Sequence, residues 1–127
     1  MNLDLSPAAK TARLNALLSL CAGGTLTIYS GPRPAPGGAT TTALLVYALS
    51  SPAGTVAGDT LTFTVPAAVA ATTAAAAVWG RIADSGGNWL LDGDAGLPDS
   101  GALFRFNDTL LVEGVMIALL AATLTEP

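Results

Sequence analysis

The chain has 127 residues, of which 51% are hydrophobic and only 11% are charged, and its formal net charge is −4. The five lysines and arginines are scattered and form no basic stripe that could neutralise phosphates, so nucleic-acid binding is not expected. The absence of histidine removes the commonest general base and metal ligand, and a single cysteine excludes an internal disulfide framework.

The length and composition predict one domain, 1–127, with a surface that is poor in charge. A chain of this length buries roughly two-thirds of the surface that it would expose when unfolded. Globular domains carry about 25% charged residues, so much of this surface is expected to meet other chains rather than water. The competing interpretation is a small, neutral surface of alanine, threonine and glycine. No apolar stretch reaches the ~20 residues of a membrane span, so no membrane contact is expected.

The first predicted element is an amphipathic helix over 6–21. Ser6 is typical of a helix N-cap and Pro7 of the first helical position, where its missing N–H costs nothing. Four apolar residues follow at the spacing of one helical face: Leu14, Leu17, Leu18 and Cys21. Because an isolated helix of about four turns is marginally stable, this face must dock. It packs either on the sheet of the same chain or on a neighbouring subunit, and the second arrangement makes the three leucines candidate partner contacts.

The same segment has a weaker interpretation as a lipoprotein signal that ends before Cys21. Lys10 and Arg13 precede a short apolar run, as they do in such signals. The residue before the cysteine is Leu20 rather than a small one, however, and the run is only about seven residues long. The helix therefore explains this segment better.

Two predicted strands flank a long proline-rich loop. Thr25–Tyr29 alternates between polar and apolar residues, and a second strand is expected at 43–49. The segment between them, 30–42, has three prolines and three glycines, so it cannot lie inside a sheet. A loop of this length is usually a binding element or disordered. Its candidate partner contacts are Arg33, Pro34 and Pro36.

The clearest strand of the chain lies at 60–65. Threonines alternate there with Leu61, Phe63 and Val65, so one face of the strand is polar and the other apolar. The alanine-rich stretch that follows is ambiguous, because alanine favours helix whereas two adjacent threonines favour extended structure. We expect a loop or one helical turn at 67–73.

A β-hairpin is the element around which the other strands are expected to assemble. Its first arm, 78–82, has the alternation of a strand, residues 84–88 have turn composition, and 89–91 forms the return arm. An isolated hairpin is marginally stable in water, so this one must pack on further strands. Trp79 and Trp89 lie on its two arms, either as core anchors or as a stacking surface for a sugar or a base.

The rest of the chain predicts short strands joined by turns. We expect a polar connection at 92–101, strands at 103–106 and 110–112, and a terminal strand at 115–125 whose apolar run indicates burial on both faces. With seven or eight short strands after one helix, the predicted fold is mainly β. It is an antiparallel β-sandwich or jelly-roll-like barrel over 24–127 that follows the N-terminal amphipathic helix.

The one cluster of carboxylates in the sequence is Asp92, Asp94 and Asp99. It departs from a calcium loop, because Gly96 and Leu97 stand where an oxygen ligand and a glycine are required. A solvated connection is the simpler interpretation, and whether this loop binds an ion stays open. Without histidine, and with a single lysine, the serine, aspartate and cysteine side chains lack an activating base. We therefore predict neither an enzymatic activity nor a cofactor.

The order of segments along the chain carries a family resemblance. These segments are the helix sequence at 9–20, Gly-Gly-Thr-Leu-Thr-Ile-Tyr-Ser-Gly at 23–31 with the prolines after it, the strand at 61–65, Val-Trp-Gly-Arg-Ile-Ala-Asp-Ser-Gly-Gly at 78–87, Asp-Gly-Asp at 92–94, and a last strand after 113–114. In this order they resemble a group of small structural proteins encoded in the virion-assembly regions of tailed bacteriophages. The chain departs from that pattern at 79–80 and at 104–106.

The resemblance implies a non-enzymatic virion component that is assembled in the host cytoplasm and forms a homo-oligomer. Its partners would be the major capsid protein or other virion subunits. A capsid decoration or cement protein is the preferred interpretation, with a neck or tail-surface protein as the alternative. A carbohydrate-binding β-sandwich module is the alternative from a different class. The candidate partner contacts are Leu14, Leu17, Leu18, Arg33, Pro34, Pro36, Trp79 and Trp89.

Overall fold

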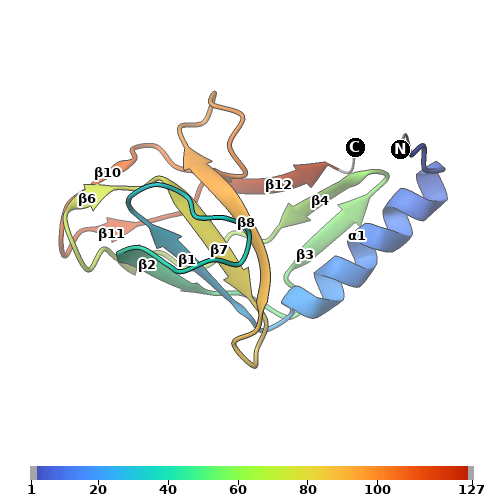
Figure 1. The fold of residues 1–127 in the computed structure, drawn as a ribbon, viewed down its shortest axis with the longest axis horizontal. Helices are drawn as coiled ribbons and strands as arrows, with labels where there is room; N and C mark the ends of the chain where they lie inside the picture. The colour runs from blue at the N-terminus through green and yellow to red at the C-terminus, as the bar shows by residue number, and fades with distance from the viewer. Residues whose placement is uncertain (1–2, 126–127) are drawn as a thin grey trace.

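The computed structural model describes residues 3–125 and is mainly β with one N-terminal helix (Figure 1). The predicted domain 1–127 includes 1–2 and 126–127, which lie outside the described residues. Helix α1 spans Pro7–Cys21. The strands are β1 (Thr25–Tyr29), β2 (Ala43–Ala48), β3 (Gly54–Ala57), β4 (Thr60–Phe63), β5 (Val69–Ala70), β6 (Ala75–Ala76), β7 (Trp79–Ala83), β8 (Trp89–Gly96), β9 (Phe104–Arg105), β10 (Leu110–Leu111), β11 (Met116–Ile117) and β12 (Ala121–Thr125). In this part of the chain, no helix has the length and apolarity that crossing a bilayer requires.

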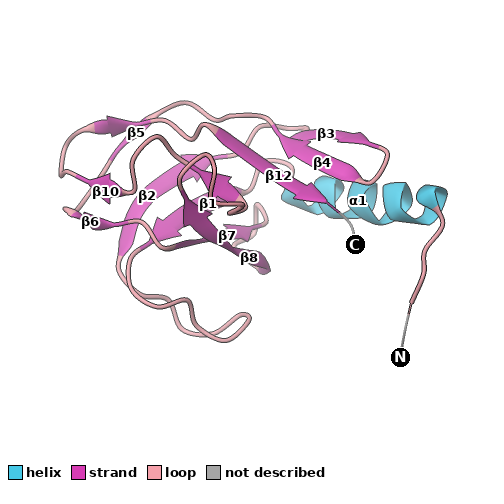
Figure 2. Cartoon of the chain, turned by 90° about the horizontal axis from the view of Figure 1, so that it is seen from above, coloured by secondary structure: helices cyan, strands magenta, loops and turns pink. Residues whose placement is uncertain are grey.

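Among the described residues, eight strands form one sheet in the order β2-β1-β7-β8-β9-β12-β4-β3. The sheet curls into half a barrel, and the short pairs β10–β6 and β11–β5 lie at the end opposite α1 (Figures 1 and 2). All neighbouring strands in the sheet are antiparallel except β8 and β9. The prediction of a mainly β chain with one N-terminal helix is confirmed, but the prediction of an antiparallel sheet is wrong at this pair. The reason is the connection 97–103, which carries the chain back beside the end of β8.

Helix α1 begins where the sequence predicts. The side chain of Ser6 accepts a hydrogen bond from the amide of Ala9 at 3.1 Å, as an N-cap does, and Pro7 occupies the first position. The hydroxyl of Thr11 donates to the carbonyl of Gly58, in the β3–β4 turn, at 2.6 Å. The helix therefore packs along β3 and β4 of its own sheet, the first of the two arrangements considered (Figure 2).

The apolar face of α1 is part of the core. Leu14 and Cys21 are buried, while Leu17 and Leu18 are half-buried against the same core. Burial raises the pKa of the Cys21 thiol to about 11, so the thiol stays protonated and weakly nucleophilic at neutral pH. The predicted amphipathic face thus serves the chain's own stability.

A pair of glycines and one phenylalanine organise the centre of the sheet. Gly80 of β7 and Gly93 of β8 are cross-strand neighbours. A Cβ at Gly80 would lie 2.8 Å from the ring of Phe104, and one at Gly93 would lie 3.2 Å from it, so only glycine leaves room for this ring. The other large side chains of the core cluster that are fully buried are Leu14, Leu26, Ile28, Leu44, Leu45, Tyr47, Leu61, Ile82, Phe106 and Leu119.

Strand β8 is longer than the sequence predicts. The composition of 92–101 indicates a polar connection, whereas β8 continues to Gly96. Asp92 is accommodated in a strand because its carboxylate pairs with Arg81 across the hairpin. Gly93 is accommodated because the core ring occupies the space beside it. Cross-strand partners here outweigh weak intrinsic β propensity.

The terminal segment 115–125 is not one buried strand. Residues 118–120 separate β11 from β12, and the amide of Leu120 donates to the carbonyl of Arg105 at 2.9 Å. The break arises because the chain leaves its pairing with β5 and begins to pair with β9 and β4. Met116 is exposed, so the prediction of burial on both faces is wrong at this position.

Three further strands were not expected from the pattern. β3 pairs with β4 over Gly54–Ala57, β5 lies within 67–73, where the prediction is a loop or a helical turn, and β6 follows at Ala75–Ala76. β5 and β6 have two residues each and β3 has four, whereas a strand is recognised by alternation over about four to eight residues. The other predicted strands, 43–49, 60–65, 103–106 and 110–112, are present with shorter bounds.

Candidate functional site

A β-bulge in the β7–β8 hairpin gathers polar side chains on one face. The register shifts within this pairing, which makes Leu90 an extra residue in β8. Without the extra residue, Trp89 and Asp92 would point to opposite faces, because side chains alternate along a strand. The bulge therefore places Trp89, Asp92 and Asp94 on the face that carries Arg81.

Arg81 and Asp92 form a two-point ion pair on this face. Nε of Arg81 donates to one carboxylate oxygen of Asp92 at 2.7 Å, and a terminal nitrogen donates to the other at 3.0 Å. Their side chains are 13% and 2% exposed. The indole N–H of Trp89 and the amide of Gly37 also donate to this carboxylate, at 3.1 and 3.2 Å. Burial raises the pKa of Asp92, but these hydrogen bonds and the charge of Arg81 outweigh it and hold the pKa below its usual value.

The same network holds the proline-rich loop against the hairpin. Arg81 donates to the carbonyl of Gly38 at 2.9 Å. Arg33 donates to the backbone carbonyl of Asp92 at 3.0 Å and to the carboxylate of Asp94 at 3.1 Å. The loop is therefore tied to β7 and β8 by charge-assisted hydrogen bonds, which are stronger than those between neutral groups.

Gly37 brings the loop against the ring of Trp89. Its φ is +72°, in the left-handed region, and a Cβ at this position would lie 3.1 Å from a ring carbon. Both conditions favour glycine, because other residues adopt this φ at a cost and carry the atom that would crowd the ring. Trp89 nevertheless remains 47% exposed, so the loop contacts this side chain but leaves it accessible to solvent.

The far end of the loop is anchored on Trp79, which is fully buried. Its ring stacks on Tyr29 with the centroids 4.4 Å apart, and the guanidinium of Arg81 lies 5.2 Å from the ring centroid. Its indole N–H donates to the hydroxyl of Thr41 at 3.0 Å, and that hydroxyl donates to the carbonyl of Ser30. Trp79 is thus a core anchor, the simpler of its two interpretations.

Some of the contact residues suggested by the sequence lie together at the surface of this loop. Arg33, Pro36, Trp89 and Asp94 are exposed, and we call these four residues the loop surface. Arg33, Trp89 and Asp94 are linked through the network, and Pro36 precedes Gly37, which packs on Trp89. Pro34 is half-buried in the same loop. Three residues singled out by the sequence, Arg33, Pro36 and Trp89, are therefore brought together by the fold.

The other candidate contacts lie elsewhere. Leu14 and Trp79 are buried and present no surface to a partner. Leu17 and Leu18 are half-buried on α1, which packs along β3 and β4, whereas the loop is tied to β7 and β8. The leucine face of the helix and the proline-rich loop therefore do not form one site.

The sequence reasoning missed the ion pair that positions the loop. Arg81 and Asp92 lie on facing arms of the hairpin, and opposite charges at facing positions are the signal that could have revealed them. Two of the three clustered aspartates serve as partners of arginines, Asp92 of Arg81 and Asp94 of Arg33. Over residues 3–125, no three potential metal-ligating side chains gather in one place.

The carboxylates of Asp92 and Asp94 are engaged by guanidinium groups, and Cys21, the protein's thiol, is buried in the core. Comparisons with protein-family models, with curated proteins and with solved structures find no match to this chain.

We expect the Arg81–Asp92 pair to stabilise the protein above about pH 4 and to lose this contribution in acid. The pKa of Asp92 is lower in the folded state, so its contribution is complete above the unfolded pKa, about 3.9, and declines as the pH falls through the folded pKa. Tm is measured between about pH 7 and pH 2.5 for the wild type and for Asp92→Asn. The gap between the two should shrink below about pH 4, and a gap that is unchanged at about pH 2.5 argues against this role.

Proposed function

We propose that this protein is a non-enzymatic structural protein of a tailed-phage virion, and specifically a decoration or cement protein that binds the major capsid lattice. The observation that carries the proposal is the loop surface, on which exposed side chains are fixed in place by an ion pair whose side chains are only 13% and 2% exposed. Because the loop is held before it meets a partner, docking costs little conformational entropy. Tryptophan and arginine are also the side chains most enriched where binding energy concentrates.

The composition supports a surface that neighbouring subunits cover. Only 11% of the residues are charged, and large apolar side chains such as Val46, in β2, and Val65, after β4, lie exposed. On a symmetric shell, a modest contact free energy is repeated at every copy. The same reasoning favours a homo-oligomer or an ordered array, located in the virion after assembly in the host cytoplasm. The resemblance to small phage structural proteins supports the same proposal.

We further propose that the architecture is a distorted relative of a β-sandwich or jelly-roll-like barrel. One curled sheet wraps a single core, as the two layers of those folds do. The parallel β8–β9 pair is the departure from that pattern.

The test of the function is the composition of purified particles. Quantitative mass spectrometry of gradient-purified virions should give a fixed ratio of this protein to the major capsid protein. Trp89→Ala should lower that ratio about tenfold without a large change in Tm, whereas Leu97→Ala, at another exposed apolar residue, should leave it unchanged. A few copies per particle would favour the neck or tail-surface alternative, and absence from particles would refute both.

A carbohydrate-binding module is the second candidate, because Trp89 is half-exposed beside the polar side chains of Arg33 and Asp94. Sugar rings stack on exposed aromatic side chains, and neighbouring polar groups bind their hydroxyls. The burial of Trp79 removes the two-ring platform that the sequence suggested. Binding of an oligosaccharide by the wild type, but not by Trp89→Ala, would favour this candidate.

A further inference from the structure

A second exposed surface lies at the end of the molecule opposite α1 (Figures 1 and 2). The segment from β10 to β11 exposes four large apolar side chains within seven residues of sequence, and we call these four the apolar tip. They are Leu110, Val112, Val115 and Met116, which are 70%, 60%, 47% and 61% exposed. Single exposed apolar residues are ordinary, but a cluster of them is typical of an interaction surface.

The backbone of the apolar tip is held by hydrogen bonds. The amide of Val115 donates to the carbonyl of Val112 at 3.2 Å and closes the turn. The amide of Gly114 donates to the carbonyl of Ala71 at 2.9 Å, and the amide of Ala71 donates to the carbonyl of Val115 at 3.1 Å. The exposed side chains therefore belong to a turn whose backbone is fixed by hydrogen bonds, which lowers the entropy cost of docking them.

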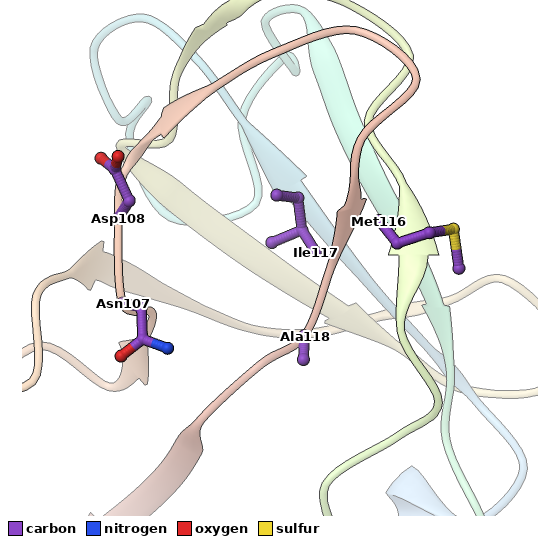
Figure 3. A pocket seen from close by; sticks show the side chains of 5 residues that line it. All are labelled: Asn107, Asp108, Met116, Ile117 and Ala118. Carbon is purple, nitrogen blue, oxygen red and sulfur yellow. The ribbon is translucent and has the colours of Figure 1, made fainter.

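A hollow of about 290 Å³ lies beside the tip. Figure 3 shows that Met116 points away from residues 107–108, whereas Ile117 points toward them. The residues that line the hollow are Asn107, Asp108, Met116, Ile117 and Ala118. The tip thus offers protruding side chains with a hollow next to them, against which an apolar surface of a partner can pack.

The charges at this end are all acidic. Asp108 and Glu113 are the charged residues of 106–125, both are exposed, and the neighbouring segment 66–77 has no charged residue. Strands β5 and β6 of that segment pair with β11 and β10, so these segments build this end of the molecule together. Electrostatic complementarity therefore requires basic groups on whatever covers the tip.

Charge argues against a second copy of the tip as the occupant, because a symmetric dimer would bring the acidic groups of the two copies, Asp108 and Glu113, together. The acidic groups disfavour an anionic membrane for the same reason.

We propose that the apolar tip docks on an apolar helix face, flanked by lysine or arginine, on a different protein. This inference goes beyond the proposed function and does not rest on it, because the loop surface uses other residues. A protein with two such surfaces would link two different partners. Because the two surfaces use different residues, an experiment that disproves one of them leaves the other unaffected.

The test uses a fluorescent helical peptide with a leucine face flanked by lysines, and a matched peptide with glutamate at every lysine position. Anisotropy with the full chain should show at least tenfold tighter binding of the lysine peptide. The double variant Val112→Ser with Met116→Ser should weaken that binding tenfold or more. Leu20→Ser, an exposed leucine on α1, is the matched control and should bind as the wild type does. Thermal unfolding verifies that each variant is folded.

Equal binding of the two peptides, equal binding by the double variant, or no binding at all would overturn the proposal. A wild-type dimer in analytical ultracentrifugation that dissociates in the double variant would overturn it in favour of a second copy. Sedimentation with phosphatidylcholine vesicles that is lost in the double variant would overturn it in favour of a lipid surface.

Discussion

Replacing Arg81 with methionine is expected to lower the free energy of unfolding by about 3–5 kcal/mol, the range for breaking a buried ion pair from one side. The substitution leaves the carboxylate of Asp92, which is 2% exposed, without its counter-charge. It also removes the hydrogen bond that holds the carbonyl of Gly38 and with it one end of the loop. Urea unfolding followed by tryptophan fluorescence measures the change.

The double variant Arg81→Met with Asp92→Leu is the matched control. It removes both charges, and apolar replacement of a buried pair is often close to neutral, so much of the lost stability should return. Asp92→Asn alone should cost less than Arg81→Met, because the side chain of Arg81 is more exposed than that of Asp92, 13% against 2%, and keeps its hydrogen bond to the carbonyl of Gly38. If the single and double variants lose the same free energy, the unpaired carboxylate is not the cause.

Gly80→Val is expected to lower the free energy of unfolding by about 3 kcal/mol, because it overpacks a filled core. A Cβ at this position would lie 2.8 Å from Cδ1 of Ile28 and 2.8 Å from the ring of Phe104, so one of these side chains must leave its rotamer. For a domain of this size, the change corresponds to a fall in Tm of roughly 10 °C. Thermal unfolding followed by circular dichroism measures it.

Two variants isolate the cause of that loss. Gly80→Val combined with Phe104→Leu makes room beside the new side chain and should be less destabilised than the sum of the two single changes. Gly86→Val lies in the exposed turn of the hairpin, where the nearest atoms are the flexible ends of Asn88 and Asp84. It should be much milder, and equal losses at Gly80 and Gly86 would rule out overpacking of the core.

The elements that depend on local chemistry were predictable from the sequence. Ser6 and Pro7 predict the start of the helix because capping involves only neighbouring residues, and α1 begins there. Thr25–Tyr29 alternates over its whole length, and β1 has the same bounds. In both elements, propensity and burial favour the same structure, so the pattern was sufficient.

The elements that depend on distant partners were not predictable in the same way. The continuation of β8 through Asp92 requires Arg81 on the other arm, and the parallel pairing of β9 depends on the path of 97–103. The bulge at Leu90 determines on which face of the hairpin Trp89 lies, yet a one-residue shift of the strand register cannot be recognised from the composition.

The candidate site was predictable in part for the same reason. Arg33, Pro36 and Trp89 stood out by residue type, because prolines exclude a strand and tryptophans are rare in this chain. That they share one surface follows from Gly37 packing on Trp89 and from the bond between Arg33 and Asp94, which are contacts between segments far apart in sequence. Leu14 belongs to the core because the helix docks on β3 and β4, a choice that periodicity alone leaves open.

The most direct test is hydrogen–deuterium exchange, measured on the free protein and on the protein bound to purified particles. It shows whether the protein binds the particle through the loop surface, which is formed before binding. We expect amide exchange in the segments 33–37 and 89–94 to be slowed several-fold on the particle, while amide exchange in α1 stays as it is in the free protein. A protein that never sediments with particles, or one that binds them without added protection of these two segments, would contradict it.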